Sequence, residues 1–303
     1  MMTRAATSAL HISMADAIQL AQARMGDSQR QLASGKKAAS FADLETPAVN
    51  ALSVHSMLGR NQAYGLVGRQ LGTTLSLYDA SLNALDSGLS ELKQTVQTAI
   101  GGNNGMGLQS SIETAFDQFS GILNTSEGGG YLFGGSRGLD QPFSPASLTE
   151  ATGMTDSQAF QSDDARLTAR LSDQQSMQYG VGAAAIGTDA LHAFRTLSAA
   201  GPFGAVLTDT QTAQLKSAIG EIESALTHVR AANAENGRNQ ARLETITEHN
   251  DDRHVLLSDI VSRNEDADLA KVATDLSRQQ TVLEASYSIF GQLGQLSLAS
   301  YLR

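Results

Sequence analysis

Two short stretches of the sequence hold the side chains best suited to chemistry. The first, HNDDRH at residues 249–254, combines histidine with aspartate, the side chains that bind metal ions or move protons. On a helix, however, His249 and His254 point about 140° away from each other, so they cannot share a metal ion. Only Asp251 and His254 lie on one face. The pattern therefore favours a solvated polar helix face.

The second stretch, NEDAD at residues 264–268, places Glu265 and Asp268 three residues apart. This spacing is compatible with paired carboxylates, but acids are also common at the start of a helix, where they interact with the helix dipole. The sequence contains no P-loop, HExxH or GxSxG motif and no cysteine. We therefore expect no catalytic, cofactor-binding or metal-binding residues, and no enzyme.

The charge and hydropathy of the chain argue against two classes of partner, nucleic acids and membranes. The net charge is −10 and no run of lysine and arginine is present, which argues against binding to nucleic acid or to an anionic membrane. No window of about 18 apolar residues occurs, so we expect no membrane span. Residues 1–22 lack the apolar block of a secretory signal. Any export is expected to use a route without a cleaved signal peptide.

Both ends of the chain carry the apolar stripe of a helix. Along residues 262–303 the larger apolar residues recur mainly every three or four positions, and residues 10–32 repeat this period. A helix cannot bury its own stripe, so each arm needs a partner helix from this chain or from another. An intramolecular bundle core and an assembly interface both remain open. The predicted assembly residues are Leu10, Met14, Ile18, Met25, Leu32, Leu269, Val272, Leu276, Leu283, Tyr287, Phe290, Leu293 and Leu296.

The two arms also carry opposite charge. Residues 1–40 hold five basic and two acidic side chains, whereas residues 250–303 hold five basic and eight acidic ones. This difference favours contact between the arms, although exposed ion pairs contribute only a few tenths of a kcal/mol each.

Long helices are expected in the two proline-free runs, residues 48–141 and 203–303. A helix should begin at Pro47 with Thr46 as its cap, although several glycines weaken its first part. From Leu71 to Ala99 the apolar residues alternate by four and three, which is typical of a long bundle helix. Another helix follows over residues 108–123. A last one should begin near Thr208, weaken through residues 231–240 and resume at Leu243.

The middle of the chain differs in character. Residues 131–145 are apolar and rich in glycine, which indicates a strand, a turn and an extended segment. Residues 165–171 and 177–183 are predicted to pair as a hairpin, and a short helix should cover residues 189–197.

The predicted fold is mainly α, a long antiparallel helical bundle of N- and C-terminal segments around a small β-containing middle domain. We divide it into an N-terminal assembly arm (1–40), N-terminal bundle helices (41–130), a β-containing outer domain (131–200), a C-terminal bundle helix (201–250) and a C-terminal assembly arm (251–303).

Two terminal motifs resemble one known family. RQLASGKK at residues 30–37 resembles the N-terminal signature of bacterial flagellins and hook-associated proteins, and NEDADLAKVATDLSRQQTVLEAS at residues 264–286 resembles their C-terminal signature. The resemblance covers about the first and the last hundred residues. FADLETP at residues 41–47 departs from the family's usual "S-D-D-P", although Pro47 stands in a similar place.

Two further segments resemble the hook–filament junction members of this superfamily more than its filament flagellins. They are YLFGGSRGLDQPF at residues 131–143 and the ending LSLASYLR. This resemblance implies a structural adaptor of the flagellum that is exported by the flagellar type III route and lies outside the cell. The alternative is a filament flagellin, and a remote alternative is a secreted enzyme that uses residues 131–200.

The resemblance also implies partners. They are other copies of the chain, hook-associated protein 1 on the hook side, flagellin on the filament side, and a flagellar export chaperone with the type III export apparatus. The arms would then form the inner helical layer of a tubular structure.

Overall fold

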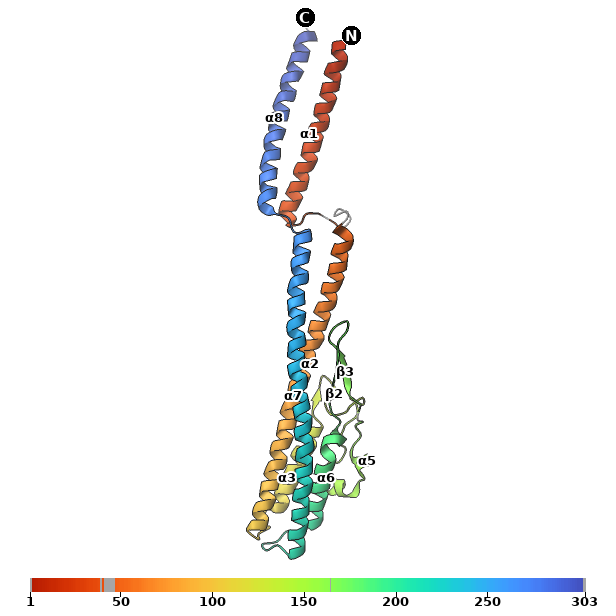
Figure 1. Ribbon diagram of the computed structural model, residues 1–303, viewed down its shortest axis with the longest axis vertical. Helices are drawn as coiled ribbons and strands as arrows, with labels where there is room; N and C mark the ends of the chain where they lie inside the picture. The colour runs from red at the N-terminus through yellow and green to blue at the C-terminus, as the bar shows by residue number, and fades with distance from the viewer. Residues whose placement is uncertain (1, 39, 41–46, 164, 302–303) are drawn as a thin grey trace. The chain divides into compact units, whose positions relative to one another are not determined.

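The computed structural model describes residues 2–38, 40, 47–163 and 165–301, and for residues 2–11, 47–48 and 293–301 it describes the backbone only. The chain is mainly α-helical, as predicted (Figure 1). Its long helices are α1 (Met2–Ser34), α2 (Pro47–Gly101), α3 (Leu108–Leu123), α6 (Ala183–Ala200), α7 (Asp209–Glu265) and α8 (Leu269–Tyr301). The chain divides into two compact units, and each is described by itself.

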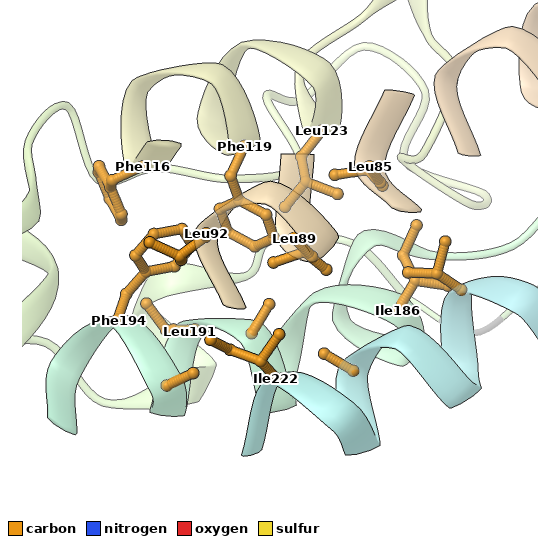
Figure 2. Packing of buried hydrophobic residues seen from close by; sticks show 14 of the residues in the cluster. Leu85, Leu89, Leu92, Phe116, Phe119, Leu123, Ile186, Leu191, Phe194 and Ile222 are labelled. Atoms are coloured by element: carbon orange, nitrogen blue, oxygen red, sulfur yellow. The ribbon is translucent and has the colours of Figure 1, made fainter. Parts of the chain in front are cut away.

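The first unit spans Asn61–Asp252 and is built on four helices, α2, α3, α6 and α7. The apolar residues of α2 predicted from the alternating spacing, from Leu71 to Val96, are all buried. From Tyr78 onward they share one core with Phe116 and Phe119 of α3, Phe194 of α6 and Ile222 of α7 (Figure 2). Burying such large side chains is the main source of stability in this unit.

Aromatic rings fill the centre of this core. Phe116 and Phe194 meet edge to face with ring centroids 5.4 Å apart, and Phe119 meets Phe143 in the same way at 5.4 Å. Phe143 also contacts Phe160. Phe143 and Phe160 belong to the middle segment, so these contacts attach it firmly to the helices.

The middle segment contains two small hairpins. Strands β1 (Ser126–Glu127) and β2 (Gly130–Tyr131) pair antiparallel, as do β3 (Leu167–Arg170) and β4 (Ser176–Tyr179). The second hairpin confirms the predicted pairing, with Leu167 opposite Tyr179 and Arg170 opposite Ser176. Two short helices lie between the hairpins, α4 (Leu148–Gly153) and α5 (Asp156–Ala159). Neither was predicted, because their apolar residues are too few to show a period.

Several predicted boundaries are corrected by the structure. Helix α2 is continuous despite its early glycines, and α7 runs through residues 231–240 without a break. Helix α6 is longer than the predicted residues 189–197. Helix α7 begins one residue after Thr208, whose hydroxyl oxygen accepts a hydrogen bond from the Gln211 amide at 3.2 Å. The predicted cap residue Thr46 lies outside the described residues.

The second unit joins the two ends of the chain, residues up to Arg60 and from Arg253 onward. Helices α1 and α8 lie side by side in this unit (Figure 1). They run antiparallel, since Gln22 contacts Tyr287 and Ser28 contacts Gln279. The C-terminal arm is not one helix from Ser262, because α7 ends at Glu265 and α8 begins at Leu269. In the described part of the chain, no helix combines the length and the apolarity needed to cross a bilayer.

Candidate assembly interface

Helices α1 and α8 meet along a narrow seam. The least exposed residues of each helix recur at alternating gaps of four and three, the spacing of a coiled-coil contact. On α1 they are Met14, Ile18, Ala21, Met25 and Ser28, and on α8 they are Val272, Leu276, Gln279, Leu283 and Ser286. Each stripe predicted from the N- and C-terminal sequences therefore finds a partner within the same chain.

Polar contacts occur within and beside this seam. The buried Ser28 hydroxyl donates to Gln279 Oε1 at 3.3 Å. Nearer the chain ends, the Gln22 amide donates to the Tyr287 hydroxyl at 2.5 Å. Such pairs contribute little free energy, but they favour one alignment of the two helices because sliding would separate them.

The predicted assembly residues fall into four groups. Val272 and Leu283 are buried in the seam, and Met14, Ile18, Met25 and Leu276 are half-buried. Four are exposed, namely Leu32, Leu269, Tyr287 and Phe290. The side chains of Leu10, Leu293 and Leu296 lie outside the described residues.

Among the described side chains of α1 and α8, four exposed apolar residues were missed by the sequence analysis. Ile12 and Leu20 lie on α1, and Val282 and Ile289 lie on α8. Val282, Ala285 and Ile289 repeat at gaps of three and four, about a quarter turn of the helix away from the seam. This second period was visible in the sequence and could have identified a second apolar face of α8.

The two terminal motifs meet where the arms begin. Residues after α1 and residues between α7 and α8 form an antiparallel bridge, in which the Lys37 amide donates to Glu265 O at 2.6 Å and the Ala267 amide donates to Gly35 O at 2.8 Å. Gly35 ends α1 in the left-handed conformation, with φ of 69°, where glycine is favoured. We call this bridge, residues 34–37 with 262–268, the clasp.

Ion pairs reinforce the clasp. Lys36 Nζ lies 2.6 Å from Asp266 Oδ1 and 3.6 Å from Glu265 Oε2, and the Lys37 ammonium donates to the carbonyl of Arg263. The hydrogen bond to Asp266 raises the pKa of Lys36. Hydrogen bonds from Lys36 and from the Ser262 hydroxyl lower the pKa of Asp266. The opposite charges predicted to attract the two arms are therefore concentrated here.

The two acids singled out in NEDAD serve separate purposes. Glu265 Oε1 lies 2.5 Å from His55 Nε2, while Asp268 Oδ1 accepts hydrogen bonds from the amides of Ala270 and Lys271 at 3.1 Å each. Asp268 thus caps the first turn of α8, and the cap explains why the C-terminal arm restarts as a new helix. The interpretation of these acids as charge at a helix start is confirmed for Asp268.

The structure brings no metal-binding group together in the part of the chain that it describes. His249 is exposed and His254 is half-buried on α7. Elsewhere, Asp156 bridges two residues of α6, with His192 Nε2 at 2.9 Å and the Arg195 guanidinium as its partners. Arg195 also donates to the carbonyls of Ala151 and Met154 at 2.9 and 2.7 Å, so this cluster attaches α4 and α5 to α6.

Comparisons with known proteins agree with this arrangement of helices. Residues 219–302 match the bacterial flagellin C-terminal helical region. A structure assigned as a flagellar hook-associated protein from Vibrio parahaemolyticus is 15% identical, with a TM-score of 0.63, and the match covers 74% of this chain and 100% of that one.

FlgL from Bacillus cereus is 17% identical with a TM-score of 0.57, over 69% of this chain and 99% of that one. No curated protein sequence matches the chain. The sequence match lies in α7 and α8, where the C-terminal signature was found, and the shared fold extends over most of the molecule. Residues 219–302 therefore resemble the C-terminal helical region of bacterial flagellins, and the chain shares its fold with these two solved structures.

Proposed function

We propose that this chain is the adaptor at the hook–filament junction, the role of hook-associated protein 3, and that it assembles through the outward faces of α1 and α8. A structural role in the flagellum is supported by the match of residues 219–302 to the flagellin C-terminal helical region. The junction is favoured by YLFGGSRGLDQPF and by the ending LSLASYLR, which resemble the junction members of the family.

The distribution of exposed apolar side chains is the observation that carries the assembly role. Fourteen of the eighteen large apolar side chains exposed in the described residues lie within positions 12–67 and 255–290. Among the described residues of the second unit, few large apolar side chains are buried, and Leu257, Val272 and Leu283 are the largest of them. Exposed apolar surface concentrated in this way is typical of surfaces that other chains cover.

Assembly would remove these side chains from water. Val282 and Ile289 are 49% and 48% exposed, and covering each one fully would stabilise the assembly by about 1 kcal/mol. Contacts of this size become effective when many copies repeat them around a closed ring or tube. The copies of the chain would therefore be held together by many modest contacts.

The further partners are part of the same proposal. Hook-associated protein 1 would bind on the hook side and flagellin on the filament side, after delivery by an export chaperone through the flagellar type III route. The protein would then lie outside the cell. A filament flagellin is the alternative, because the matching C-terminal region is named for flagellins.

The test replaces two residues of the outward face of α8 in the full chain. Val282→Asp with Ile289→Asp would place charge on this face and leave the seam with α1 intact. We expect normal helicity and solubility but filaments that detach from hooks, scored by motility and electron microscopy. The matched control is Gln280→Asp with Ser288→Asp, because both residues are exposed and polar and lie on other faces of α8. Filaments that stay attached in the Val282 and Ile289 variant would refute the proposal.

A further inference from the structure

Helices α2 and α7 pair through a heptad repeat that is interrupted by asparagine. Every seventh residue of α7 from Leu215 to Leu257 is at least half-buried, and the run reads Leu, Ile, Val, Asn, Leu, Asn, Leu. The matching run of α2, from Asn61 to Val96, reads Asn, Gly, Leu, Leu, Leu, Val and is buried throughout. Asparagine in such a run costs stability unless its amide finds a partner.

Two of these asparagines find their partners on the opposite helix. The Asn61 amide donates to the main-chain carbonyl of Asn250 at 2.8 Å, and the Asn236 amide donates to the carbonyl of Leu75 at 2.9 Å. Asn61 is 6% exposed and Asn236 is 7% exposed. Each helix thus supplies one donor and one acceptor, and the two contacts are fourteen residues apart on both helices.

A glycine lies midway between the two contacts. A Cβ atom at Gly68 would lie 3.5 Å from the Thr247 hydroxyl and 3.9 Å from Leu243 Cδ1. A Cβ atom at this position would therefore make ordinary van der Waals contacts with α7, so the two helices lie close together at the level of Gly68.

The leucine pattern alone does not specify this alignment. Leu75, Leu82 and Leu89 repeat every seven residues, so a slip of one heptad would exchange one apolar contact for another. The same slip would move Asn61 from Asn250 to Leu243 or Leu257, and Asn236 from Leu75 to Gly68 or Leu82. Both amides would lose their present partners at once and would meet the main-chain carbonyls of other residues, and Gly68 would no longer face Leu243. An amide that finds no new partner in the slipped alignment is strongly unfavourable.

The same alignment positions the second hairpin. The Asn250 side chain donates to the carbonyl of Leu171 at 3.1 Å, next to the end of β3. Leu171 and Met177 of this hairpin are buried against Leu71, Leu75, Leu243 and Ile246. Asn250 therefore accepts a hydrogen bond from α2 at its main-chain carbonyl and donates one to the hairpin from its side-chain amide. A change in the alignment of α2 with α7 would therefore move the hairpin.

We propose that Asn61 and Asn236 form a register lock, which selects one antiparallel alignment of α2 with α7 and thereby sets the position of the β3–β4 hairpin. They act as positioning residues, and their effect lies in specificity more than in stability.

The absence of cysteine makes this lock testable by disulfide trapping in the full chain. The pair Gly68→Cys with Thr247→Cys reports the observed alignment, and Gly68→Cys with His254→Cys reports a slip of one heptad. Each cysteine pair is introduced into the wild-type chain and into the double variant Asn61→Leu with Asn236→Leu. Each protein is then unfolded in urea, refolded and oxidised. The intrachain disulfide is then quantified by mass spectrometry, alongside the melting temperature.

In the wild-type background we expect at least tenfold more disulfide from the first pair than from the second. In the double leucine variant, the disulfide yield of the second pair, which reports the slip, should rise at least tenfold. The melting temperature should stay equal or increase. The matched control is Asn83→Leu with Asn233→Leu, which removes a 2.8 Å hydrogen bond between side chains of the same two helices. This control should keep the wild-type ratio.

Two results would overturn the proposal. One is a slipped-pair yield in the double leucine variant that stays at the wild-type level. The other is a rise of equal size in the Asn83 and Asn233 control. If the double variant fails to refold, the single variants Asn61→Leu and Asn236→Leu are measured in the same way. Each single variant should raise the disulfide yield of the pair that reports the slip. If neither variant raises this yield, the proposal is also overturned.

Discussion

At the scale of single residues, the clasp depends on the charge of Asp266. Its pKa is lowered by the hydrogen bonds from Lys36 and Ser262, so the ionised form stabilises the clasp. A lowered pKa in the folded state means that this contribution is present above the ordinary value of about 3.9 and is lost as the pH falls below it. The clasp should therefore be less stable in acid than at neutral pH.

This pH dependence can be measured at two amides of the clasp, those of Lys37 and Ala267. In the wild-type protein, their protection from hydrogen exchange should fall as the pH drops below about 4. Asp266→Asn should lower protection roughly two- to fivefold at neutral pH, since exposed pairs are weak, and should abolish the pH dependence. Asp259→Asn is the control, because Asp259 lies outside the clasp and pairs with the exposed side chain of Arg263. Equal protection in the wild type and in Asp266→Asn would contradict the role of this carboxylate.

Sequence analysis predicted the components of the clasp but not the clasp itself. The two motifs and the opposite charges of the arms were visible, and they indicated that the arms attract each other. The pairing of Lys36 with Asp266 was not predictable, because their 230-residue separation carries no periodic signal. Asp268 was recognised as charge at a helix start, because capping is a local interaction that sequence reveals well.

At the scale of elements, α8 carries two apolar faces with different roles. Leu283 is 5% exposed in the seam with α1, whereas the adjacent Val282 is 49% exposed on the outward face. Leu283→Ala should destabilise the α1–α8 pair by about 2 kcal/mol, because a buried side chain is removed. Val282→Ala should change its stability by less than about 0.5 kcal/mol.

Hydrogen exchange of the α1 and α8 amides in the isolated protein separates these two effects. Protection should fall in Leu283→Ala and stay at the wild-type level in Val282→Ala. Both substitutions shorten an aliphatic side chain on the same turn, so each serves as the control for the other. An equal loss of protection in both variants would mean that the seam and the outward face are not distinct.

Periodicity predicted the long helices well and failed where polar residues lie in a helical seam. The polar run at residues 231–240 was expected to weaken α7, yet the helix is continuous there. Asn236 and Gln240 both donate to the carbonyl of Leu75, at 2.9 and 3.1 Å. These partners lie on another helix, so a pattern read along one segment cannot show them. The short helices α4 and α5 were not predicted for a related reason, because they are held in place by contacts with α6.

At the scale of the whole molecule, the two units differ in how much of their apolar surface is buried. The unit of residues 61–252 buries a large aromatic and aliphatic core, whereas the unit of the chain ends leaves many apolar side chains exposed. The fold class was predictable because long amphipathic helices dominate the sequence. The five-part division into arms, bundle helices and outer domain stays a prediction, as do the specific partners.

The most direct test of the junction role is the location of the protein on native flagella. Intact flagella would be labelled with gold-conjugated antibodies against residues 61–252, and the label would be mapped by electron microscopy. We predict label confined to a short zone at the base of the filament, next to the hook. Label along the whole length of the filament would contradict the junction role and identify a filament flagellin instead.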